Sequence, residues 1–386
     1  MATPAPAPAL YIASTPLIAL SCAAAALRNG GRAALVVIED FDLAPRLQSL
    51  LESWRDNPFE RIERFPGRYV APGLRSDARG AAALVQRARR QRLSRRGILA
   101  ALRALDAEFR PVQVWLGNDR RVETQLALDL ASRRIGASAG RYLDDGLYTY
   151  LGDVREGRDR WRIDDELKRL AYGRWWTRVA HAGTSPWIAE DWLAYPALAP
   201  AAYDPGAIRR LPVDWFANRA FARLCIDAAR AFALERCALR SCDAVVVMPH
   251  SEQLRAQPKF ALGIRAMAAR IAAEGRRIAV KHHPRETEPD PAGLIQTGTA
   301  MALPSLLPME LLLPLLPRGA LLLGEITTAL LAAHWLRPDL TVRDLGLASG
   351  RYAERARALF LQAGIPSLHG EIANAFAGDR GPGVAP

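Results

Sequence analysis

The stretch ALYIASTPLIALSCAAAALRNGGRAALVVI, residues 9–38, decides the fold class. Its first five residues, 9–13, form a short apolar run that predicts a buried strand. Thr15 followed by Pro16 is typical of a helix start, and the following residues 17–28 end at a glycine pair that is typical of a helix stop. Residues 32–38, rich in valine and alanine, predict a second strand. A strand, a helix and a strand open a βαβ unit.

The same alternation continues along the chain. A strand expected at 112–116 lies between helices at 79–107 and 120–133. A second series follows, with helices expected at 219–240, 262–274, 327–336 and 351–363, and strands at 244–248, 277–281, 320–323 and 340–343. Such alternation indicates parallel sheets, and therefore an α/β protein with two halves and a cleft between them.

Three segments are expected from this pattern. Residues 1–215 form an N-terminal domain, 216–350 a second domain, and 351–386 a C-terminal helix with a flexible tail. The segment 148–212, rich in tryptophan, arginine and proline, is interpreted as a connecting region of the first domain.

Composition excludes several protein classes. With 386 residues, 50% hydrophobic and 24% charged, the chain is long enough for about two domains with cores, so disorder and collagen-like repeats are excluded. The net charge of +12 comes almost entirely from arginine, since only three of the 52 basic residues are lysines. No nucleic-acid-binding signature accompanies this charge, so no nucleic-acid partner is expected. A basic surface suits anionic substrates or an anionic membrane leaflet.

Cysteine usage and hydropathy indicate the compartment. The four cysteines contain no CxxC pair, which is typical of reduced core thiols. The N-terminus lacks the pattern of a signal peptide, and four prolines interrupt the longest apolar stretch, 301–323. We therefore expect a cytoplasmic protein, with peripheral contact to the inner membrane left open.

A first cluster with chemical potential is Asp144-Asp145-Gly146, which follows an apolar stretch. Adjacent carboxylates repel one another, so one pKa can be raised toward the working range of a general base. The alternative is a plain turn, because Asp-Gly is a common turn dipeptide.

A second cluster follows an expected buried strand. Lys281, His282, His283 and Arg285 place several donors near one point, which suits a phosphate or diphosphate leaving group. An imidazole can also donate a proton to a leaving group. A solvated charged loop is the alternative, and no carboxylate or cysteine at ligand spacing favours a metal.

A third cluster opens a helix. Gly324 ends an expected strand, and Thr327 and Thr328 follow at the helix start, where hydroxyls and backbone amides together bind anions. Thr327 is alternatively only an N-cap. No GxGxxG follows a strand and no GxxxxGK[ST] occurs, which disfavours dinucleotide-binding and P-loop proteins.

Other candidates share a position directly after an expected strand, and each has a plain interpretation as a turn or helix cap. Those predicted to line the acceptor side or pocket of the first domain are Ser14, Thr15, Asn118 and Asp119, and those predicted to flank a nucleotide in the second domain are Pro249, His250 and Ser251.

The order of the three clusters is more specific than any one of them. Acid-acid-Gly, then Lys-x-His-Pro, then Thr-Thr resembles the bacterial lipooligosaccharide sialyltransferases and capsule polysialyltransferases, glycosyltransferase families 52 and 38, with their D/E-D/E-G, H-P and paired Ser/Thr motifs. The segments 11–17 and 308–312 are also similar to that group. The resemblance spans about residues 9–345 apart from the tryptophan-rich middle, and Thr-Thr replaces the more familiar serine pair.

This resemblance implies a GT-B fold, with two Rossmann-like domains facing across a cleft. It also implies inverting, metal-independent transfer of a nonulosonic acid, sialic acid first, from a CMP-activated donor to a hydroxyl of a surface glycan or lipid-linked acceptor. No cofactor or metal is implied. The roles carried over are Asp145 as general base with Asp144 as the alternative, His283 as general acid on the CMP phosphate, Lys281 near the nucleotide, Thr327 and Thr328 at the phosphate, and Glu310 at the ribose.

Other functions stay open at this point. The nearest is a transferase using CMP-Kdo or another CMP-nonulosonate. A UDP-sugar epimerase or transferase is more distant, because it binds a diphosphate. A non-catalytic basic protein that binds membranes or RNA would leave the three clusters as turns.

Overall fold

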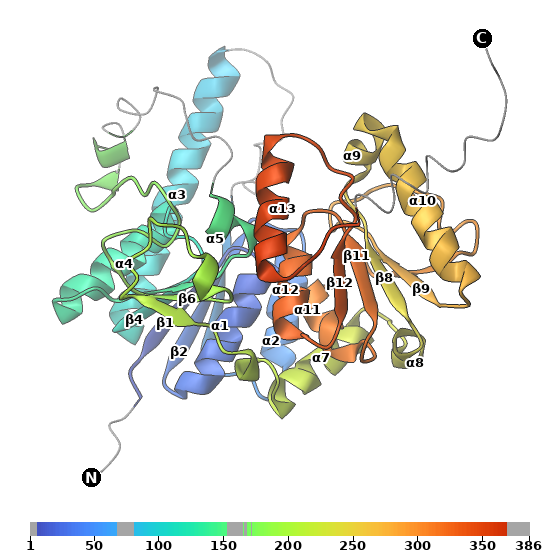
Figure 1. The fold of residues 1–386 in the computed structure, drawn as a ribbon. Helices are drawn as coiled ribbons and strands as arrows, with labels where there is room; N and C mark the ends of the chain where they lie inside the picture. Colours follow the sequence, from blue (N-terminus) through green and yellow to red (C-terminus); the bar gives the residue numbers. More distant parts are fainter. Residues whose placement is uncertain (1–5, 68–80, 153–164, 166–167, 171, 369–386) are drawn as a thin grey trace. The chain divides into compact units, whose positions relative to one another are not determined.

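The computed structural model describes residues 6–67, 81–152, 165, 168–170 and 172–368. The chain divides into two compact units, Met1–Phe221 and Ala222–Pro386 (Figure 1). The division falls inside helix α7 (Arg219–Ala231), six residues beyond the boundary expected after residue 215. The expected flexible tail lies almost entirely outside the described residues.

The described residues of the first unit form a seven-stranded sheet of order β3-β2-β1-β4-β5-β6-β7 in which every pair is parallel. The strands are β1 (Ala9–Ala13), β2 (Ala33–Glu39), β3 (Arg61–Pro66), β4 (Gln113–Leu116), β5 (Gly140–Leu143), β6 (Ile188–Leu193) and β7 (Ile208–Arg210). The helical segments between them are α1 (Pro16–Asn29), α2 (Ala44–Ser53), α3 (Ala81–Phe109), α4 (Val122–Ile135), α5 (Leu147–Leu151) and the 3-10 turn η1 (Pro196–Leu198), and a second 3-10 turn, η2 (Val213–Trp215), follows β7.

The opening βαβ unit forms as its sequence predicts. Thr15 caps α1 by accepting a hydrogen bond from the Ile18 amide at 3.3 Å. Gly30 ends the helix with a φ of +64°, a conformation that glycine adopts without a steric penalty.

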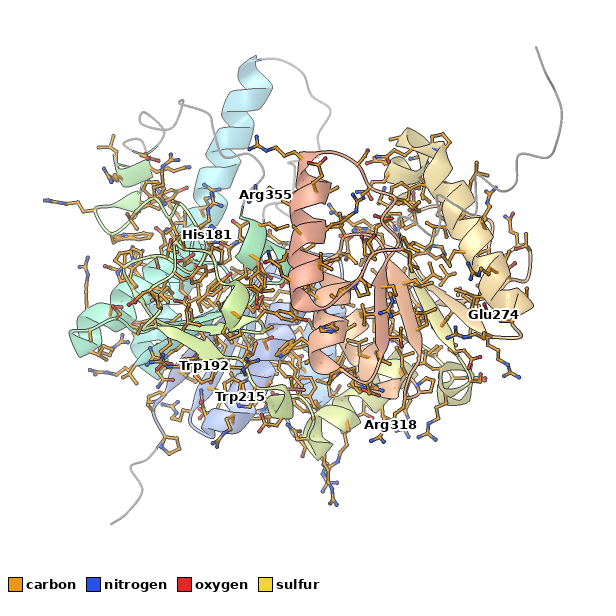
Figure 2. All side chains as sticks on the ribbon, viewed as in Figure 1. His181, Trp192, Trp215, Glu274, Arg318 and Arg355 are labelled. Atoms are coloured by element: carbon orange, nitrogen blue, oxygen red, sulfur yellow. The ribbon has the colours of Figure 1, made fainter. Side chains whose placement is uncertain are left out.

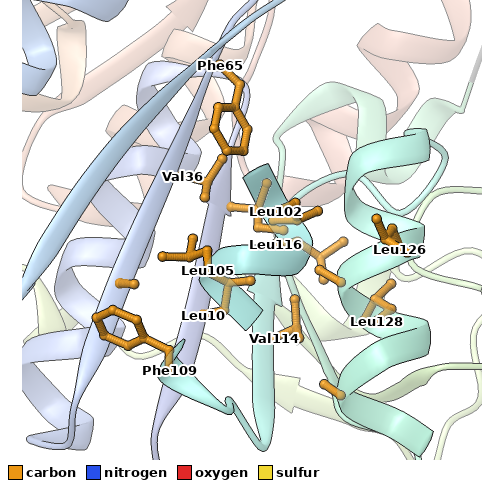
Figure 3. Packing of buried hydrophobic residues seen from close by; sticks show 14 of the residues in the cluster. Leu10, Val36, Phe65, Leu102, Leu105, Phe109, Val114, Leu116, Leu126 and Leu128 are labelled. Carbon is orange, nitrogen blue, oxygen red and sulfur yellow. The ribbon is translucent and has the colours of Figure 1, made fainter. Parts of the chain in front are cut away.

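One hydrophobic core of this unit lies between its sheet and helices α3 and α4 (Figure 3). Because side chains alternate along a strand, Leu10, Val114 and Leu116 point to one face of the sheet. Leu102 and Leu126 cover them from the two helices. Burial of these apolar side chains stabilises the folded state by on the order of 25 cal/mol per Å² of apolar surface removed from water. This packing holds in place the strands that carry the candidate site.

The tryptophan-rich segment within 148–212 is not merely the connecting region that the sequence suggested. It supplies β6 and β7, which extend the first sheet beyond β5. The Trp192 ring lies 5.9 Å from that of Trp115 and 5.0 Å from that of Trp215 (Figure 2). This segment is therefore an integral part of the first unit.

The described residues of the second unit form a five-stranded parallel sheet of order β10-β9-β8-β11-β12 (Figure 1). Its strands are β8 (Ala244–Val247), β9 (Ile278–Lys281), β10 (Ala300–Leu303), β11 (Leu321–Gly324) and β12 (Thr341–Asp344). Its further helical segments are α8 (Arg236–Arg240), α9 (Ser251–Ala256), α10 (Pro258–Ala273), α11 (Met309–Leu312), η3 (Leu313–Leu315), α12 (Thr328–Leu336) and α13 (Arg351–Ala363).

Two details of the second unit differ from expectation. The helix expected at 219–240 is divided into α7 and α8, with Ala233 between them at a φ of +52°. Strand β10 and helix α11, which precede β11, were not among the expected elements. Among the described residues, no helix is long and apolar enough to cross a bilayer.

Candidate active site

Parallel pairing brings the candidate residues of the first unit to one edge of its sheet. Ile12 pairs with Leu116, and Leu116 pairs with Tyr142. After one intervening residue, each of these aligned positions is followed by a pair of candidate residues. The three pairs are Ser14 and Thr15, Asn118 and Asp119, and Asp144 and Asp145. Neighbouring strands lie about 4.8 Å apart, so these three pairs gather at one carboxyl edge.

Asp144 is buried and its carboxylate is fully engaged. Oδ1 accepts from the Gly146 amide at 2.8 Å, and Oδ2 accepts from the Ala194 amide at 2.8 Å and from the Tyr150 hydroxyl. Burial raises the pKa of Asp144, and these hydrogen bonds oppose the increase. Asp144 thus links the turn after β5 to the segment after β6, and its carboxylate is not available to a substrate hydroxyl.

Asp145 is half-buried and held differently. Its amide donates to Thr149 Oγ1 at 2.8 Å, and its Oδ1 accepts from Thr15 Oγ1 at 2.9 Å. Burial raises the pKa of Asp145 to about 7, the hydrogen bond from Thr15 lowers it, and the charge of Asp144 adds a smaller increase. Burial, and not the repulsion between adjacent carboxylates expected from the sequence, is the main cause of the raised pKa of Asp145.

Thr15 combines the two roles that the sequence left as alternatives. Its oxygen caps α1, and its hydroxyl contacts Asp145. Gly117 permits this arrangement, because a Cβ at position 117 would lie under 3.0 Å from the Ile18 side chain of α1. Ser14, one residue before the cap, is half-buried.

Asn118 and Asp119 separate into two roles. Asn118 is half-buried, and its Oδ1 accepts from the Arg120 amide at 3.0 Å, which forms a turn. Asp119 is fully buried, and its two oxygens accept from the amides of Gly183 and Ser185, each at 2.9 Å. The prediction that Asp119 lines an acceptor pocket is replaced by a structural role, because its carboxylate holds a loop distant in sequence.

Residues that the sequence analysis missed brace the acidic turn. Thr149 Oγ1 also hydrogen-bonds the Tyr142 hydroxyl at 2.9 Å, and the Thr149 carbonyl lies 2.8 Å from His181 Nε2 (Figure 2). Tyr150 accepts from the Tyr195 amide at 3.0 Å. The proximity of Thr149 and Tyr150 to the acidic pair was a usable signal, whereas nothing near His181 in sequence pointed to this contact.

The second unit gathers its candidates in the same way. Leu303 pairs with Lys281, Lys281 with Val247, and Val247 with Gly324. The segments after these four aligned residues carry Glu310, His282 with His283, Pro249 to Ser251, and Thr327 with Thr328. These four segments therefore begin side by side at the carboxyl edge of one sheet.

His283 has one occupied ring nitrogen. Nδ1 accepts from the Arg285 amide at 3.2 Å, so a neutral ring carries its proton on Nε2. No hydrogen bond from the described part of the chain reaches that Nε2. Burial lowers the pKa of His283, and the charges of Arg285 and His250 lower it further. The ring is thus suited to donate a hydrogen bond from Nε2.

His250 and Ser251, which follow β8, contact other residues of the second unit. His250 contacts the His283 ring edge-on at a centroid distance of 5.5 Å, and its nitrogens contact the Glu252 amide at 3.2 Å and the Arg285 carbonyl at 3.3 Å. Ser251 is buried, and its amide donates to Glu286 Oε2 at 2.7 Å. A glutamate of the chain itself therefore occupies the start of α9.

Lys281 is buried and bonded internally. Its Nζ donates to the Ser305 carbonyl at 2.6 Å and to the His282 carbonyl at 3.2 Å. Burial lowers its pKa to about 8, and the charge of Glu310 opposes this decrease. Lys281 thus ties β9 to the segment that leads to Glu310, a half-buried side chain whose pKa is raised by burial.

Thr327 is the N-cap of α12, with Oγ1 accepting from the Ala329 amide at 3.4 Å, and Thr328 is the first residue of the helix. Both are half-buried. The cap uses a lone pair of Thr327, so its hydroxyl hydrogen remains for another acceptor. Within the described ranges, no group of three or more His, Cys, Asp and Glu side chains is arranged to hold a metal ion.

Comparison with known proteins establishes the fold. No protein-family model and no curated protein match the sequence. The structure is similar to UDP-GlcNAc 2-epimerase from Methanocaldococcus jannaschii, with a TM-score of 0.52, 11% identity, and coverage of 96% of this chain and 91% of that one. It is also similar to an α/β-galactoside α-2,3-sialyltransferase from the luminous marine bacterium Photobacterium phosphoreum, with a TM-score of 0.53, 10% identity, and coverage of 95% and 98%.

These similarities place the chain in the GT-B-type fold class, an α/β architecture with two parallel Rossmann-like sheets. The fold predicted from the sequence is confirmed. At these identities the likeness concerns the fold alone, and that fold is shared by sugar-nucleotide epimerases and sialyltransferases.

Proposed function

We propose that the protein is an inverting, metal-independent glycosyltransferase. It moves a nonulosonic acid, sialic acid first, from a CMP-activated donor to a hydroxyl of a surface glycan or lipid-linked acceptor, in the cytoplasm or at the inner membrane surface. The observation that carries the proposal is the difference between two adjacent acids. Asp144 is saturated with hydrogen bonds, whereas Asp145 is half-buried, has a pKa of about 7, and keeps one carboxylate oxygen for a substrate.

In the proposed reaction, Asp145 is the general base. Its Oδ2 takes the proton of the acceptor hydroxyl while the acceptor oxygen bonds to the anomeric carbon of the donor sugar. The bond from that carbon to the CMP phosphate breaks on the opposite face, so the configuration inverts. A carboxylate with a pKa near neutrality is well matched to this proton transfer.

The leaving group is a phosphate monoester, and the second unit supplies donors for it. His283 donates from Nε2, and the Thr327 hydroxyl with the first amides of α12 adds further donors. Each such donor contributes about 2–4 kcal/mol of transition-state stabilisation in comparable sites. With these groups in place, a divalent ion is not needed. Glu310 is assigned to the ribose hydroxyls, and Lys281 supports its segment through Ser305.

A second candidate function is that of a UDP-sugar enzyme. The UDP-GlcNAc 2-epimerase from Neisseria meningitidis, whose structure contains UDP-GlcNAc, is also similar in fold, with a TM-score of 0.50, 11% identity, and coverage of 96% of this chain and 90% of that one. Of the two basic side chains in the second cluster, Lys281 is buried and tied to carbonyls, and only Arg285 is exposed, which favours a monophosphate over a diphosphate. CMP-Kdo and related CMP-nonulosonates share the nucleotide with the leading proposal.

A panel of sugar nucleotides tests the proposal. We expect CMP and CMP-sialic acid to raise the melting temperature, UDP- and GDP-sugars to have little effect, and EDTA to change neither binding nor hydrolysis. D145N should bind CMP-sialic acid but not transfer the sugar, while D42N, a change at an exposed aspartate, should behave as wild type. Preferential stabilisation by UDP-GlcNAc, or turnover that requires a divalent ion, would refute the proposal.

A further inference from the structure

The Thr15 hydroxyl is shared between a helix and the proposed base. Its oxygen accepts from the Ile18 amide at 3.3 Å, and its hydrogen is directed to Asp145 Oδ1 at 2.9 Å. A hydroxyl has one hydrogen and two lone pairs. Since the helix amide requires the oxygen as an acceptor, the single hydrogen is left for the carboxylate, and the direction of this hydrogen bond is determined.

Helix capping alone does not require this contact. An N-cap needs only a side-chain acceptor, whereas Thr15 also donates to a residue 130 positions away in sequence. Asp145 is held at its other end as well, because its amide donates to Thr149 Oγ1. No hydrogen bond from the described residues reaches Asp145 Oδ2. The carboxylate is therefore anchored through one oxygen and available through the other.

We propose that Thr15 is a positioning residue that orients Asp145, so that Oδ2 is the oxygen that takes the acceptor proton, and that stabilises the ionised form of this base. This inference rests on the proposed function for its catalytic meaning. The hydrogen bond from Thr15 lowers the pKa of Asp145, in opposition to burial. Without it, a smaller fraction of the base would be ionised at neutral pH.

Three substitutions separate the two roles of Thr15. T15S keeps both the helix cap and the hydroxyl donor. T15D keeps a cap of similar quality but has no hydrogen to donate when ionised, and its charge lies beside Asp145. T15V removes both roles. If Thr15 only caps α1, T15V loses stability and leaves the titration of Asp145 unchanged, and if Thr15 positions Asp145, T15V moves that titration. T15D shows whether a cap alone maintains stability, because its charge disturbs Asp145 in either case.

The first readout is the pH dependence of kcat/KM. A hydrogen bond to a charged group is typically strong enough to change an equilibrium about tenfold. We therefore expect the acidic limb of the profile to move up by roughly one pH unit in T15V and by at least as much in T15D. At pH 7 this shift corresponds to about a fivefold loss in T15V, because the pKa of Asp145 is about 7 in the wild type. T15S should retain the wild-type limb.

The second readout does not depend on transfer activity. The titration of Asp145 is obtained from the pH dependence of thermal stability in each Thr15 background, compared with the same background carrying D145N. T15V should raise the apparent pKa of Asp145, and T15S should not. If T15V lowers stability but leaves this titration as in wild type, Thr15 is only a cap and the inference is overturned. If the titration moves while no variant transfers sugar from any CMP donor, the positioning role stands and the proposed function fails.

Discussion

Two adjacent carboxylates with the same chemistry have different surroundings, and this difference leads to opposite predictions. In D144N, an amide nitrogen replaces an oxygen that accepts from the Gly146 or Ala194 amide, so two donors face each other in a buried site. The expected loss of stability is about 1–3 kcal/mol. In D145N the fold is retained and the transfer rate falls by about 10² to 10⁴. Thermal melts and initial transfer rates on both variants check this.

The reverse pattern would assign the base to Asp144. If D144N melts like wild type and is inactive, while D145N transfers sugar normally, the hydrogen bonds around Asp144 do not have the structural role given to them. The exposed-site variant D42N controls for a general effect of removing one carboxylate from this unit.

The raised pKa of Asp145 predicts the direction of a pH effect on stability. In the unfolded chain this carboxyl titrates near 3.8, and in the folded protein near 7, so the folded state holds the proton more tightly. Stability from this residue is present below about pH 4 and is lost as the pH rises to about 7. The total is on the order of 4 kcal/mol.

Urea unfolding of wild type and D145N between pH 4 and 8 measures this effect. The stability of D145N relative to wild type should increase with pH over this interval and level off above about pH 7.5. A constant difference would show that the Asp145 carboxyl titrates as in water. Asp191 and Glu325, whose pKa values burial also raises to about 7, act in the same direction in both proteins and cancel in the comparison.

Sequence patterns indicated these residues but not their roles. The position of Asp144 and Asp145 after a strand was readable, because apolar runs followed by acid-acid-Gly mark a strand end. The donors that distinguish the two acids come from Thr15 and from Ala194 after β6, which are remote in the chain. No local pattern reports such partners. For the same reason, the engagement of Asp119 by Gly183 and Ser185 was missed.

Among the structural elements, α1 is the one whose placement matters most for the proposed site. Its close approach to β4 depends on Gly117, since a Cβ there would lie under 3.0 Å from Ile18. G117A should therefore displace α1 and separate Thr15 from Asp145. We expect a loss of about 1–3 kcal/mol in stability, typical of overpacking, and a larger proportional loss of activity.

The matched control for this prediction is G97A in helix α3, where an added Cβ would meet no atom within 4 Å. Alanine is favoured over glycine inside a helix, so G97A should leave activity unchanged and increase stability by up to about 1 kcal/mol. Equal behaviour of the two variants would mean that Ile18 accommodates the extra methyl group and that α1 is not held by this contact.

Elements were predictable where local pattern and burial agree. Strands β1, β8 and β11 are continuous apolar runs, and β2, β4 and β9 carry a single polar residue at one end, as expected of strands covered on both faces. Strand β3 contains three charged residues, and β7 is only three residues long. Both lie at the edges of the first sheet, where one side of the strand is unpaired and apolar continuity is weaker. They are therefore elements that the sequence did not reveal.

At the scale of the whole molecule, the fold admits several sugar-nucleotide reactions, so the choice among them depends on which unit contributes which group. The proposal assigns the nucleotide to the second unit and proton abstraction to the first. D145N should then leave the stabilisation by CMP unchanged. H283A, which removes the proposed phosphate donor, should lose about half of this stabilisation.

Thermal melts of the full chain with increasing CMP measure this separation of roles. At a concentration 100 times the Kd, a ligand stabilises the folded state by about 2.7 kcal/mol, so a tenfold weaker Kd in H283A lowers that value by about 1.4 kcal/mol. D42N and D145N should follow the wild-type curve. A loss of CMP stabilisation in D145N equal to that in H283A would contradict the assignment, because a base that acts only on the acceptor hydroxyl makes no contribution to nucleotide binding.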